Sequence, residues 1–404
     1  MNADVRQYLV VTGSYWGFTL TDGALRMLVV LYFHGLGYSP LEVATLFLFY
    51  EFFGMVTNLL GGWLAARIGL NHTLQAGLLL QVAALSMLLV ETTVLSVVYV
   101  MFAQALSGIA KDLNKMSAKS SIKLLVPGDM PGRLYHWVSV LTGSKNTLKG
   151  IGFFLGGLLL AWVGFRGAIA ALIAGLLLVF VAGLFLLRKE FGKTQFKPKF
   201  SELFSTSKAV NRLSLARFFL FGSRDVWFVV ALPVFLQTQL HWSYAEVGAL
   251  LAVWIIGYGI VQSLAPVLTG LSSGRLPSGK TALTWGGALC VVPLIIAVAL
   301  YCGVDAAHCI VIGLLVFGAL FAVNSAVHSY LIVAYARQQG VSLDVGFYYM
   351  ANAAGRLVGT LLSGAVFQWA GFEACLLVSM LMILLTSLIS MRLPSGDYML
   401  DCKE

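Results

Sequence analysis

Basic residues are concentrated in one part of an otherwise apolar chain. Only 11% of the 404 residues are charged, yet seven Lys and Arg residues lie between positions 111 and 149, with just two carboxylates, Asp112 and Asp129, among them. A lysine at the centre of a bilayer costs roughly 2.5–3.5 kcal/mol, so such residues persist where an anion or a carboxylate compensates them. Because nearby carboxylates are few, the cluster indicates a site for an anionic ligand. Its members are Lys111, Lys115, Lys119, Lys123, Arg133, Lys145 and Lys149.

The first lysines of this cluster recur every four residues, which places Lys111, Lys115 and Lys119 on one face of a helix. We take Lys111 and Lys115 as candidate substrate ligands, with a membrane-surface anchor as an equally weighted alternative. For Lys119 and Lys123 the surface anchor is the favoured interpretation. Asp112, beside the first two lysines, allows local hydrogen bonding.

Lys145 and Lys149 lie near the middle of the apolar segment 136–163 and share a helical face. From that depth a lysine side chain does not easily reach the membrane surface. We predict that both bind the anion, the alternative being a buried ion pair with Glu51 or Asp22.

Two further arginines in apolar segments lie next to aspartates. Arg26 follows Asp22 by one helical turn, and Arg224 directly precedes Asp225. Both arginines are candidate substrate ligands. The pair of Asp22 and Arg26 either neutralises itself or opens when an anion arrives, and in the second case Asp22 becomes free to take a proton. Because carboxylates inside membranes commonly belong to proton relays, Asp22, Glu51 and Asp225 are the proton-coupling candidates.

The charged residues deep within the apolar segments also predict the sign of the ligand's charge. Cations outnumber carboxylates by two at these positions, which favours a ligand with several negative charges. An arsenite site would need converging thiolates, but the five cysteines form no CxxC pair, so neither a metal site nor a cofactor is expected. The positions counted are Arg26, Lys145, Lys149, Arg224 and Arg356 against Asp22, Glu51 and Asp225.

The composition defines the class of protein that must position these residues. The chain is 59% hydrophobic, whereas a soluble protein has about 25% charged residues, so we predict an all-α protein that crosses a membrane many times. Apolar segments long enough to span a bilayer, which takes about 20 residues, recur along the whole chain. The twelve segments are 8–33, 43–66, 72–92, 95–116, 136–163, 167–188, 211–236, 245–270, 281–302, 307–334, 343–369 and 371–392.

The net charge of +9 is a topology signal rather than a sign of nucleic-acid binding. With the N-terminus inside, nearly all the loop Lys and Arg residues fall on the cytoplasmic side, as in membrane proteins generally. Both termini are therefore predicted to be cytoplasmic, and no cleavable signal peptide is expected. The opposite side carries Glu42, Glu91, Glu246, Asp305 and Glu373, with Arg166 as its one basic residue.

The two halves of the chain repeat each other. Segments 136–163 and 343–369 match at a constant offset of 207, and Lys149 corresponds to Arg356. We therefore predict that Arg356 also binds the anion, from the second half of the chain. Asp22 and Asp225 occupy near-equivalent positions with a slip of one residue. Six spans per half give two parallel repeats, with a substrate site near the membrane midplane. The remaining matches are Gly152 with Gly359, Gly157 with Gly364, Trp162 with Trp369, Gly164 with Gly371 and Phe165 with Phe372.

We therefore expect a six-helix bundle over residues 1–188 and a second bundle with a short tail over 211–404. Residues 189–210 are the least apolar stretch and are predicted to form a cytoplasmic linker. The glycines near Lys149 and Arg356 favour close helix packing rather than nucleotide binding. Asn324 and His328, one turn apart, are expected to be a hydrogen-bonded core pair, with the lining of a polar cavity as the alternative.

Several motifs resemble known transporters. The stretch from Gly62 to Gly69 resembles the glycine/arginine loop of major facilitator transporters, but has Ala66 where an aspartate is usual, which removes one partner of the gating ion pair found in many members. Other motifs resemble the ArsJ-type organoarsenical efflux permeases, and this resemblance covers essentially the whole chain. These motifs are Asp22–Val29, Phe49–Glu51, Leu106–Lys123 and Leu141–Lys145.

The resemblance implies secondary active export of 1-arseno-3-phosphoglycerate across the cytoplasmic (inner) membrane, and so arsenate resistance. It also implies a functional link to glyceraldehyde-3-phosphate dehydrogenase, which makes this compound when it accepts arsenate in place of phosphate. The residues alone also allow an organophosphate or other organic-anion transporter. An enzyme is not expected, because no catalytic motif or extramembrane domain is visible. The expected partners are the small anion and the lipid bilayer, and the protein is expected to be a monomer.

Overall fold

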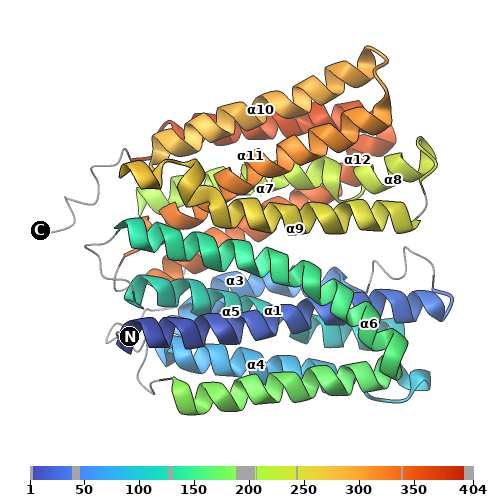
Figure 1. Cartoon of the computed structure of the whole chain (residues 1–404), viewed down its shortest axis with the longest axis vertical. Coiled ribbons are helices and arrows are strands. Elements are labelled where there is room, and N and C mark those ends of the chain that lie inside the picture. The colour runs from blue at the N-terminus through green and yellow to red at the C-terminus, as the bar shows by residue number, and fades with distance from the viewer. Residues whose placement is uncertain are drawn as a thin grey trace, which may run out of the picture. The chain divides into compact units, whose positions relative to one another are not determined.

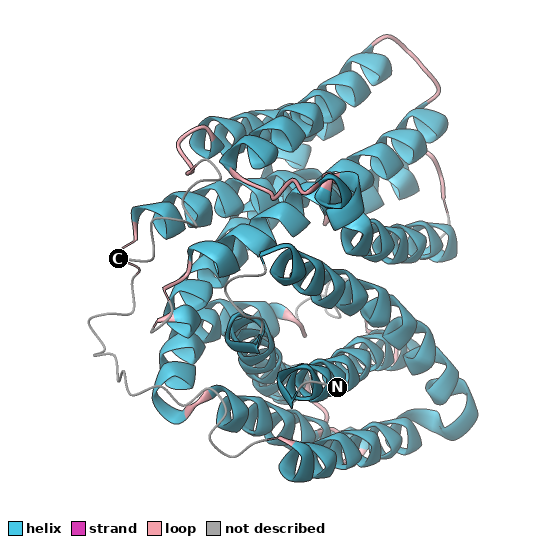
Figure 2. Cartoon of the chain, turned by 60° about the vertical axis from the view of Figure 1, so that its left-hand side comes forward, coloured by secondary structure: helices cyan, strands magenta, loops and turns pink. Residues whose placement is uncertain are grey.

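The structure is a computed structural model that describes residues 3–38, 46–125, 131–187, 205, 207–242, 244–337 and 340–394. These residues form α-helices and short 3-10 turns, with no β-strand among them (Figure 2). The helices, labelled in Figure 1, are α1 (Ala3–Gly35), α3 (Leu48–Ile68), α4 (Leu70–Met87), α5 (Val97–Leu125), α6 (Pro131–Leu186), α7 (Lys208–Phe228), α8 (Ala231–Thr238), α9 (Tyr244–Leu268), α10 (Gly279–Tyr301), α11 (Ala306–Tyr335) and α12 (Val341–Ser390).

Two of these helices are each a pair of helices joined at a glycine. A straight helix of 56 residues, the length of α6, would extend about 84 Å, far beyond a hydrocarbon core of about 30 Å. Instead α6 doubles back (Figure 1), with non-helical angles at Gly164 (φ 69°, ψ 178°). In α12 the break is at Gly371 (φ 83°, ψ −174°). Positive φ favours glycine, so the predicted boundaries between 163 and 167 and between 369 and 371 are confirmed.

The chain divides into two compact units. Unit 1 comprises Met1–Met130, Lys145–Phe204 and Ala336–Met350, and unit 2 comprises Pro131–Ser144, Ser205–Tyr335 and Ala351–Glu404. The units therefore differ from the two predicted halves in two segments, the beginning of α6 and the beginning of α12. Most of the predicted linker, 189–210, lies outside the described residues, as do residues 39–45.

Close backbone contacts explain why the beginning of α6 belongs to unit 2 and the beginning of α12 belongs to unit 1. In unit 1, a Cβ on Gly346 of α12 would lie 2.7 Å from the carbonyl oxygen of Asn58 on α3. In unit 2, a Cβ on Gly143 of α6 would lie 2.5 Å from the carbonyl oxygen of Gly259 on α9, and Tyr135 shares a 2.9 Å hydrogen bond with Thr269. Small residues thus let each segment approach a neighbouring helix closely.

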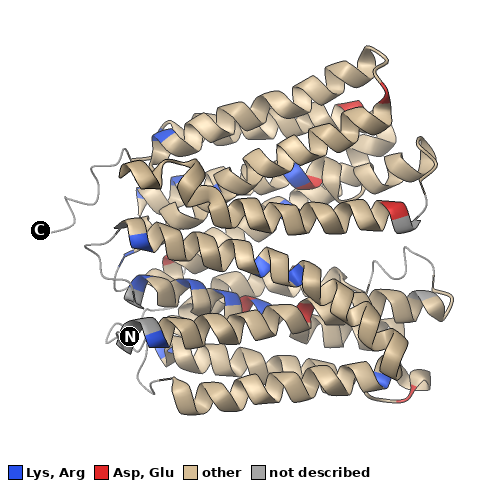
Figure 3. Ribbon diagram, in the orientation of Figure 1, with Lys and Arg blue, Asp and Glu red and all other residues tan. Residues whose placement is uncertain are grey.

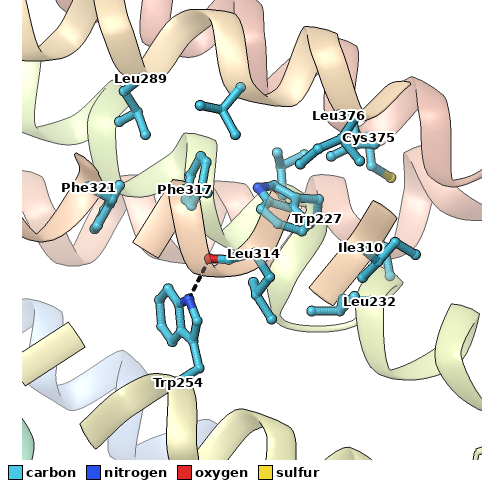
Figure 4. Packing of buried hydrophobic residues seen from close by; sticks show 14 of the residues in the cluster. Trp227, Leu232, Trp254, Leu289, Ile310, Leu314, Phe317, Phe321, Cys375 and Leu376 are labelled. Atoms are coloured by element: carbon cyan, nitrogen blue, oxygen red, sulfur yellow. Dashed lines mark hydrogen bonds between the residues drawn. The ribbon is translucent and has the colours of Figure 1, made fainter. Parts of the chain in front are cut away.

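Each unit has its own apolar core. In unit 2 the core surrounds Trp227, whose ring contacts Phe317 and Phe372 edge to face; nearby, the indole of Trp254 donates to the carbonyl oxygen of Leu314 at 2.9 Å (Figure 4). In unit 1 the core lies among α1, α4, α5 and α6. The outward surface is also apolar, because Phe185 is 84% exposed. Apolar side chains inside and outside are typical of a protein surrounded by lipid.

The helix lengths agree with membrane spanning. Within the described residues, six helices are long and apolar enough to cross a bilayer. Figure 3 shows long stretches of helix without charge, interrupted by Lys and Arg residues partway along α5 and α6. Charged side chains inside membrane spans are costly, so these Lys and Arg residues are expected to have a functional role.

The predicted packing role of the glycines near Lys149 and Arg356 is confirmed at four of six positions. A Cβ on Gly152 would lie 2.5 Å from the carbonyl oxygen of Leu20, and a Cβ on Gly359 would lie 2.6 Å from that of Gly222. Gly156 and Gly355 make similar contacts with the backbone of Ala24 and Phe218. By contrast, Gly157 has only an ordinary contact and Gly364 has none.

We therefore expect Gly152→Val to lower the thermal stability of the purified protein in detergent, because the neighbouring backbone of α1 cannot yield as a flexible side chain would. Overpacking of this kind typically costs about 1–3 kcal/mol. Gly157→Val, five residues further along α6, is the matched control and should melt close to the wild-type temperature. Equal melting temperatures for the two variants would contradict the packing explanation.

Candidate substrate-binding site

The lysine-rich stretch lies entirely within one helix. The α5 helix continues to Leu125, beyond the predicted end at residue 116, so all four lysines spaced by four residues are helical. Lys119 is 2% exposed and lies inside the protein, so the prediction that it is a membrane-surface anchor was wrong. Lys123 donates to the carbonyl oxygen of Ala336 within unit 1. Tertiary packing therefore covers lysines that the sequence alone placed at the lipid surface.

Lys111 and Lys115 share one carboxylate. The ammonium of Lys111 lies 3.8 Å from Asp112 Oδ2, and Lys115 forms an ion pair with Asp112 Oδ1. Each ammonium also lies over an aromatic ring, that of Lys111 being 3.8 Å from the Tyr50 centroid and that of Lys115 being 4.6 Å from the Tyr349 centroid. The local hydrogen bonding predicted for Asp112 is confirmed. One carboxylate for two cations leaves the group positive.

The expected pair of Asp22 and Arg26 does not form. The Arg26 guanidinium instead reaches Glu51 of α3, with Nη2 3.3 Å from Oε1, and stacks over Tyr50 at 4.7 Å. Asp22 accepts a 2.7 Å hydrogen bond from the Tyr50 hydroxyl. Although Asp22 and Arg26 share a face of α1, the neighbouring helix α3 supplies a partner for each of them. The carboxylate that an anion bound to Arg26 would displace is thus Glu51.

Lys149 differs from Arg26, Lys111 and Lys115, each of which contacts a carboxylate. It is half-buried on α6 and, within the described part of the chain, forms neither an ion pair nor a hydrogen bond through its ammonium. The alternative of a buried ion pair with Glu51 or Asp22 is therefore wrong for Lys149. The charges acting on it belong to Arg26, Asp22, Lys145 and Lys111, three of which are positive. Lys145, one turn earlier, is also half-buried.

Helix register accounts for one difference between Lys149 and its repeat equivalent Arg356. Gly152 meets α1 at Leu20 and Gly23, and the repeat-equivalent Gly359 meets α7 at Gly222 and Asp225. Gly23 therefore occupies the position in α1 that Asp225 occupies in α7. Asp22 matches Arg224 instead, which replaces the predicted equivalence of the two aspartates.

In unit 2 Arg356, the repeat equivalent of Lys149, is paired with a carboxylate. Asp225 is fully buried and accepts from two arginines, with Arg224 Nη2 2.5 Å from Oδ1 and Arg356 Nε 3.1 Å from Oδ2. Both arginines retain further N–H donors, since a guanidinium carries five. The repeat-related basic residues are consequently unlike each other, because Arg356 has a carboxylate while Lys149 does not.

One buried arginine in unit 2 was missed from the sequence. Arg217 is 3% exposed, donates to Asn352 Oδ1 at 2.9 Å and to Ser325, and lies over the Phe221 ring at 3.9 Å. It lies seven residues before Arg224 on α7, a spacing that puts both on one face and was the available signal.

The expected hydrogen-bonded pair of Asn324 and His328 does not form. Both side chains are fully buried on α11, and neither makes a hydrogen bond with the described residues. Buried polar groups of this kind are normally satisfied by water or a ligand. This favours the alternative interpretation, in which the two side chains line a polar region of unit 2.

The structure thus brings most of the predicted residues together in two groups, one in each unit. The group in unit 1 holds five cations against three carboxylates, a surplus of two positive charges, while the group in unit 2 centres on one aspartate with two arginines. The unit 1 group contains Arg26, Lys111, Lys115, Lys145 and Lys149 with Asp22, Glu51 and Asp112, and the unit 2 group contains Arg224, Arg356 and Asp225.

A helical protein with several apolar spans is a multi-pass membrane protein, and charged groups buried within such spans mark functional sites such as substrate pathways. The sequence profile of the Major Facilitator Superfamily matches residues 9–223 and 213–397, and the chain belongs to this family. Members of the family are transporters, which agrees with the expectation that the chain is not an enzyme.

Solved structures share the fold. A bacterial homologue of the iron transporter ferroportin in its outward-facing state is 17% identical, with a TM-score of 0.74 and coverage of 97% of this chain and 99% of that chain. The human organic anion transporter MFSD10 (TETRAN) is 15% identical, with a TM-score of 0.75 and coverage of 96% and 100%. A variant of the E. coli fucose:proton symporter FucP is 12% identical, with a TM-score of 0.76 and coverage of 98% and 100%. Comparison with curated protein sequences gave no match.

Proposed function

We propose that this transporter exports an anionic organoarsenical, 1-arseno-3-phosphoglycerate, by alternating access and thereby confers arsenate resistance. The observation that carries the anionic part of the proposal is Lys149, a half-buried cation that forms no ion pair with the described residues and lies among other positive charges. The arsenical identity rests on the resemblance of the sequence motifs.

The unit 1 group supplies suitable chemistry for such a ligand. Ammonium groups bind phosphoryl and arsenyl oxygens as point charges, and the Arg26 guanidinium can present two parallel N–H groups to them. A surplus of two positive charges suits an anion of at least two negative charges. In unit 2, Arg224 and Arg356 are the proposed counterparts, and each must be shared between Asp225 and the ligand.

The direction of transport is supported by simple electrostatics. A membrane potential that is negative inside favours outward movement of an anion by about 2.3 kcal/mol per charge per 100 mV. The electrical free energy therefore favours movement of a multivalent anion out of the cytoplasm. If protons are also coupled, the ion pair between Arg26 and Glu51 makes Glu51 the first candidate, because an anion that binds Arg26 weakens its hold on this carboxylate.

The membrane arrangement completes the proposal. We propose twelve spans in two six-helix bundles, 1–188 and 211–404, joined by a cytoplasmic linker at 189–210, with both termini in the cytoplasm. The paired helices within α6 and α12 support this count. The protein is proposed to act as a monomer in the cytoplasmic membrane.

Everted membrane vesicles provide the test. Supplied with glyceraldehyde-3-phosphate dehydrogenase, glyceraldehyde 3-phosphate, NAD⁺ and radiolabelled arsenate, vesicles containing the transporter should accumulate arsenic, and vesicles without it should not. Repeating the assay with and without a proton gradient separates voltage-driven from proton-coupled movement. If unmodified 3-phosphoglycerate accumulates equally well, the protein is a general organophosphate carrier. The absence of accumulation of either compound would refute anion export.

A further inference from the structure

Tyr50 lies at the centre of the unit 1 group and is itself uncharged. Its side chain is 2% exposed on α3. Its hydroxyl donates to Asp22 of α1 at 2.7 Å, and its ring contacts two cations, the Arg26 guanidinium at 4.7 Å and the Lys111 ammonium at 3.8 Å. One aromatic residue therefore contacts three charged groups from two other helices.

The hydrogen bond from Tyr50 determines which group the carboxylate of Asp22 contacts. Asp22 forms no ion pair within the described ranges, yet its charge acts on Lys149. The backbones are adjacent as well, because a Cβ on Gly23 would lie 2.7 Å from the carbonyl oxygen of Lys149. A carboxylate and an ammonium on adjacent helices can pair, and such a pair gains the attraction of two opposite charges. Here a neutral hydroxyl holds the carboxylate instead.

We propose that Tyr50 is a positioning residue that keeps Asp22 from pairing with Lys149, and so leaves Lys149 open for the substrate anion. The ring has a second effect, because a cation on an aromatic ring is partly stabilised by it. The ring thus adds to the stabilisation that Glu51 gives Arg26 and Asp112 gives Lys111. This inference rests on the proposed function, in which Lys149 binds the anion.

The proposal predicts the effect of Tyr50→Phe, which removes the hydroxyl and keeps the ring. Asp22 is then released to pair with Lys149 and competes with the substrate. The half-saturating concentration for arsenic accumulation in everted vesicles should rise about tenfold, while the maximal rate changes less, because the substrate at saturation still displaces Asp22. The double variant Tyr50→Phe/Asp22→Asn should return the half-saturating concentration towards the wild-type value, because the competing charge is gone.

A second measurement needs no transport at all and so separates this inference from the proposed function. Amine acylation of Lys149 in the purified protein, quantified by peptide mass spectrometry, reports whether its ammonium is paired. Labelling should fall several-fold in Tyr50→Phe and recover in Tyr50→Phe/Asp22→Asn. The exposed Lys280 serves as the internal reference for the reagent.

Tyr135→Phe is the matched control, since it removes a buried tyrosine hydroxyl in unit 2 and should leave Lys149 labelling unchanged. The inference is overturned if Tyr50→Phe labels like the wild type, or if the Asp22→Asn change fails to restore labelling. If labelling behaves as expected but no vesicles accumulate arsenic, the proposed substrate is wrong and the positioning role of Tyr50 stands.

Discussion

Lys149→Ala is expected to lower substrate-dependent accumulation about a hundredfold, the loss that corresponds to removing a strong hydrogen bond to a charged group. The reason is that Lys149 has no carboxylate partner among the described residues, so the substrate anion is its proposed partner. The same substitution should leave the thermal stability of the purified protein unchanged or slightly higher, because a cation surrounded by Arg26, Lys111 and Lys145 contributes repulsion to the empty transporter.

The combination of lost transport and retained stability identifies a binding residue rather than a structural one. Lys149→Arg keeps the charge and should retain part of the activity. Arg166→Ala removes an exposed basic residue after the α6 reversal and should transport normally. Wild-type accumulation in Lys149→Ala would exclude Lys149 from the site, and a large fall in melting temperature would assign it a structural role.

The second prediction with a large effect concerns the two arginines of unit 2 and the aspartate that both of them contact. Arg356→Ala is expected to abolish accumulation but to leave the protein folded, because Asp225 keeps its 2.5 Å contact with Arg224. Asp225→Ala should instead lower the melting temperature strongly. It leaves two arginines without their carboxylate, and breaking a buried ion pair on one side typically costs about 3–5 kcal/mol. Differential scanning fluorimetry in detergent measures both variants.

Asp225→Asn serves as the isosteric control, since it keeps the volume and one acceptor oxygen and removes the charge. If it melts like Asp225→Ala, the carboxylate charge is what matters, as proposed. If Arg356→Ala is as unstable as Asp225→Ala, then Arg224 alone does not neutralise the aspartate, and the transport defect of Arg356→Ala would have a structural cause.

The helices of this protein follow from local sequence to an unusual degree. Long apolar runs separated by short polar connections define where helices begin and end, since a bilayer requires about 20 apolar residues per span. Gly164 and Gly371 are examples, because each lies at a predicted boundary between two helices and takes a positive φ there. The end of α5 was predicted nine residues too early because its lysines look like a membrane boundary, whereas neighbouring helices cover them.

The partners of the charged residues could not be obtained in the same way. Sequence spacing pairs Asp22 with Arg26 on one helix, but spacing cannot weigh that contact against Tyr50 and Glu51 on α3. Arg217 was overlooked for a similar reason. Its partners, Asn352 and Ser325, are more than a hundred residues away in the sequence.

The sequence by itself determined the class of this protein, its helical segments, the repeat and the excess of buried positive charge, because hydrophobicity, length and charge are properties of local composition. Only the tertiary structure decided which cation is left without a carboxylate. That outcome depends on the Tyr50 hydrogen bond to Asp22 and on helix register at the glycine contacts, where Gly23 faces α6 beside Lys149 and Asp225 faces α12 beside Arg356. A shift of one residue turns a side chain by about 100° around a helix, and such a shift has no signature in local sequence.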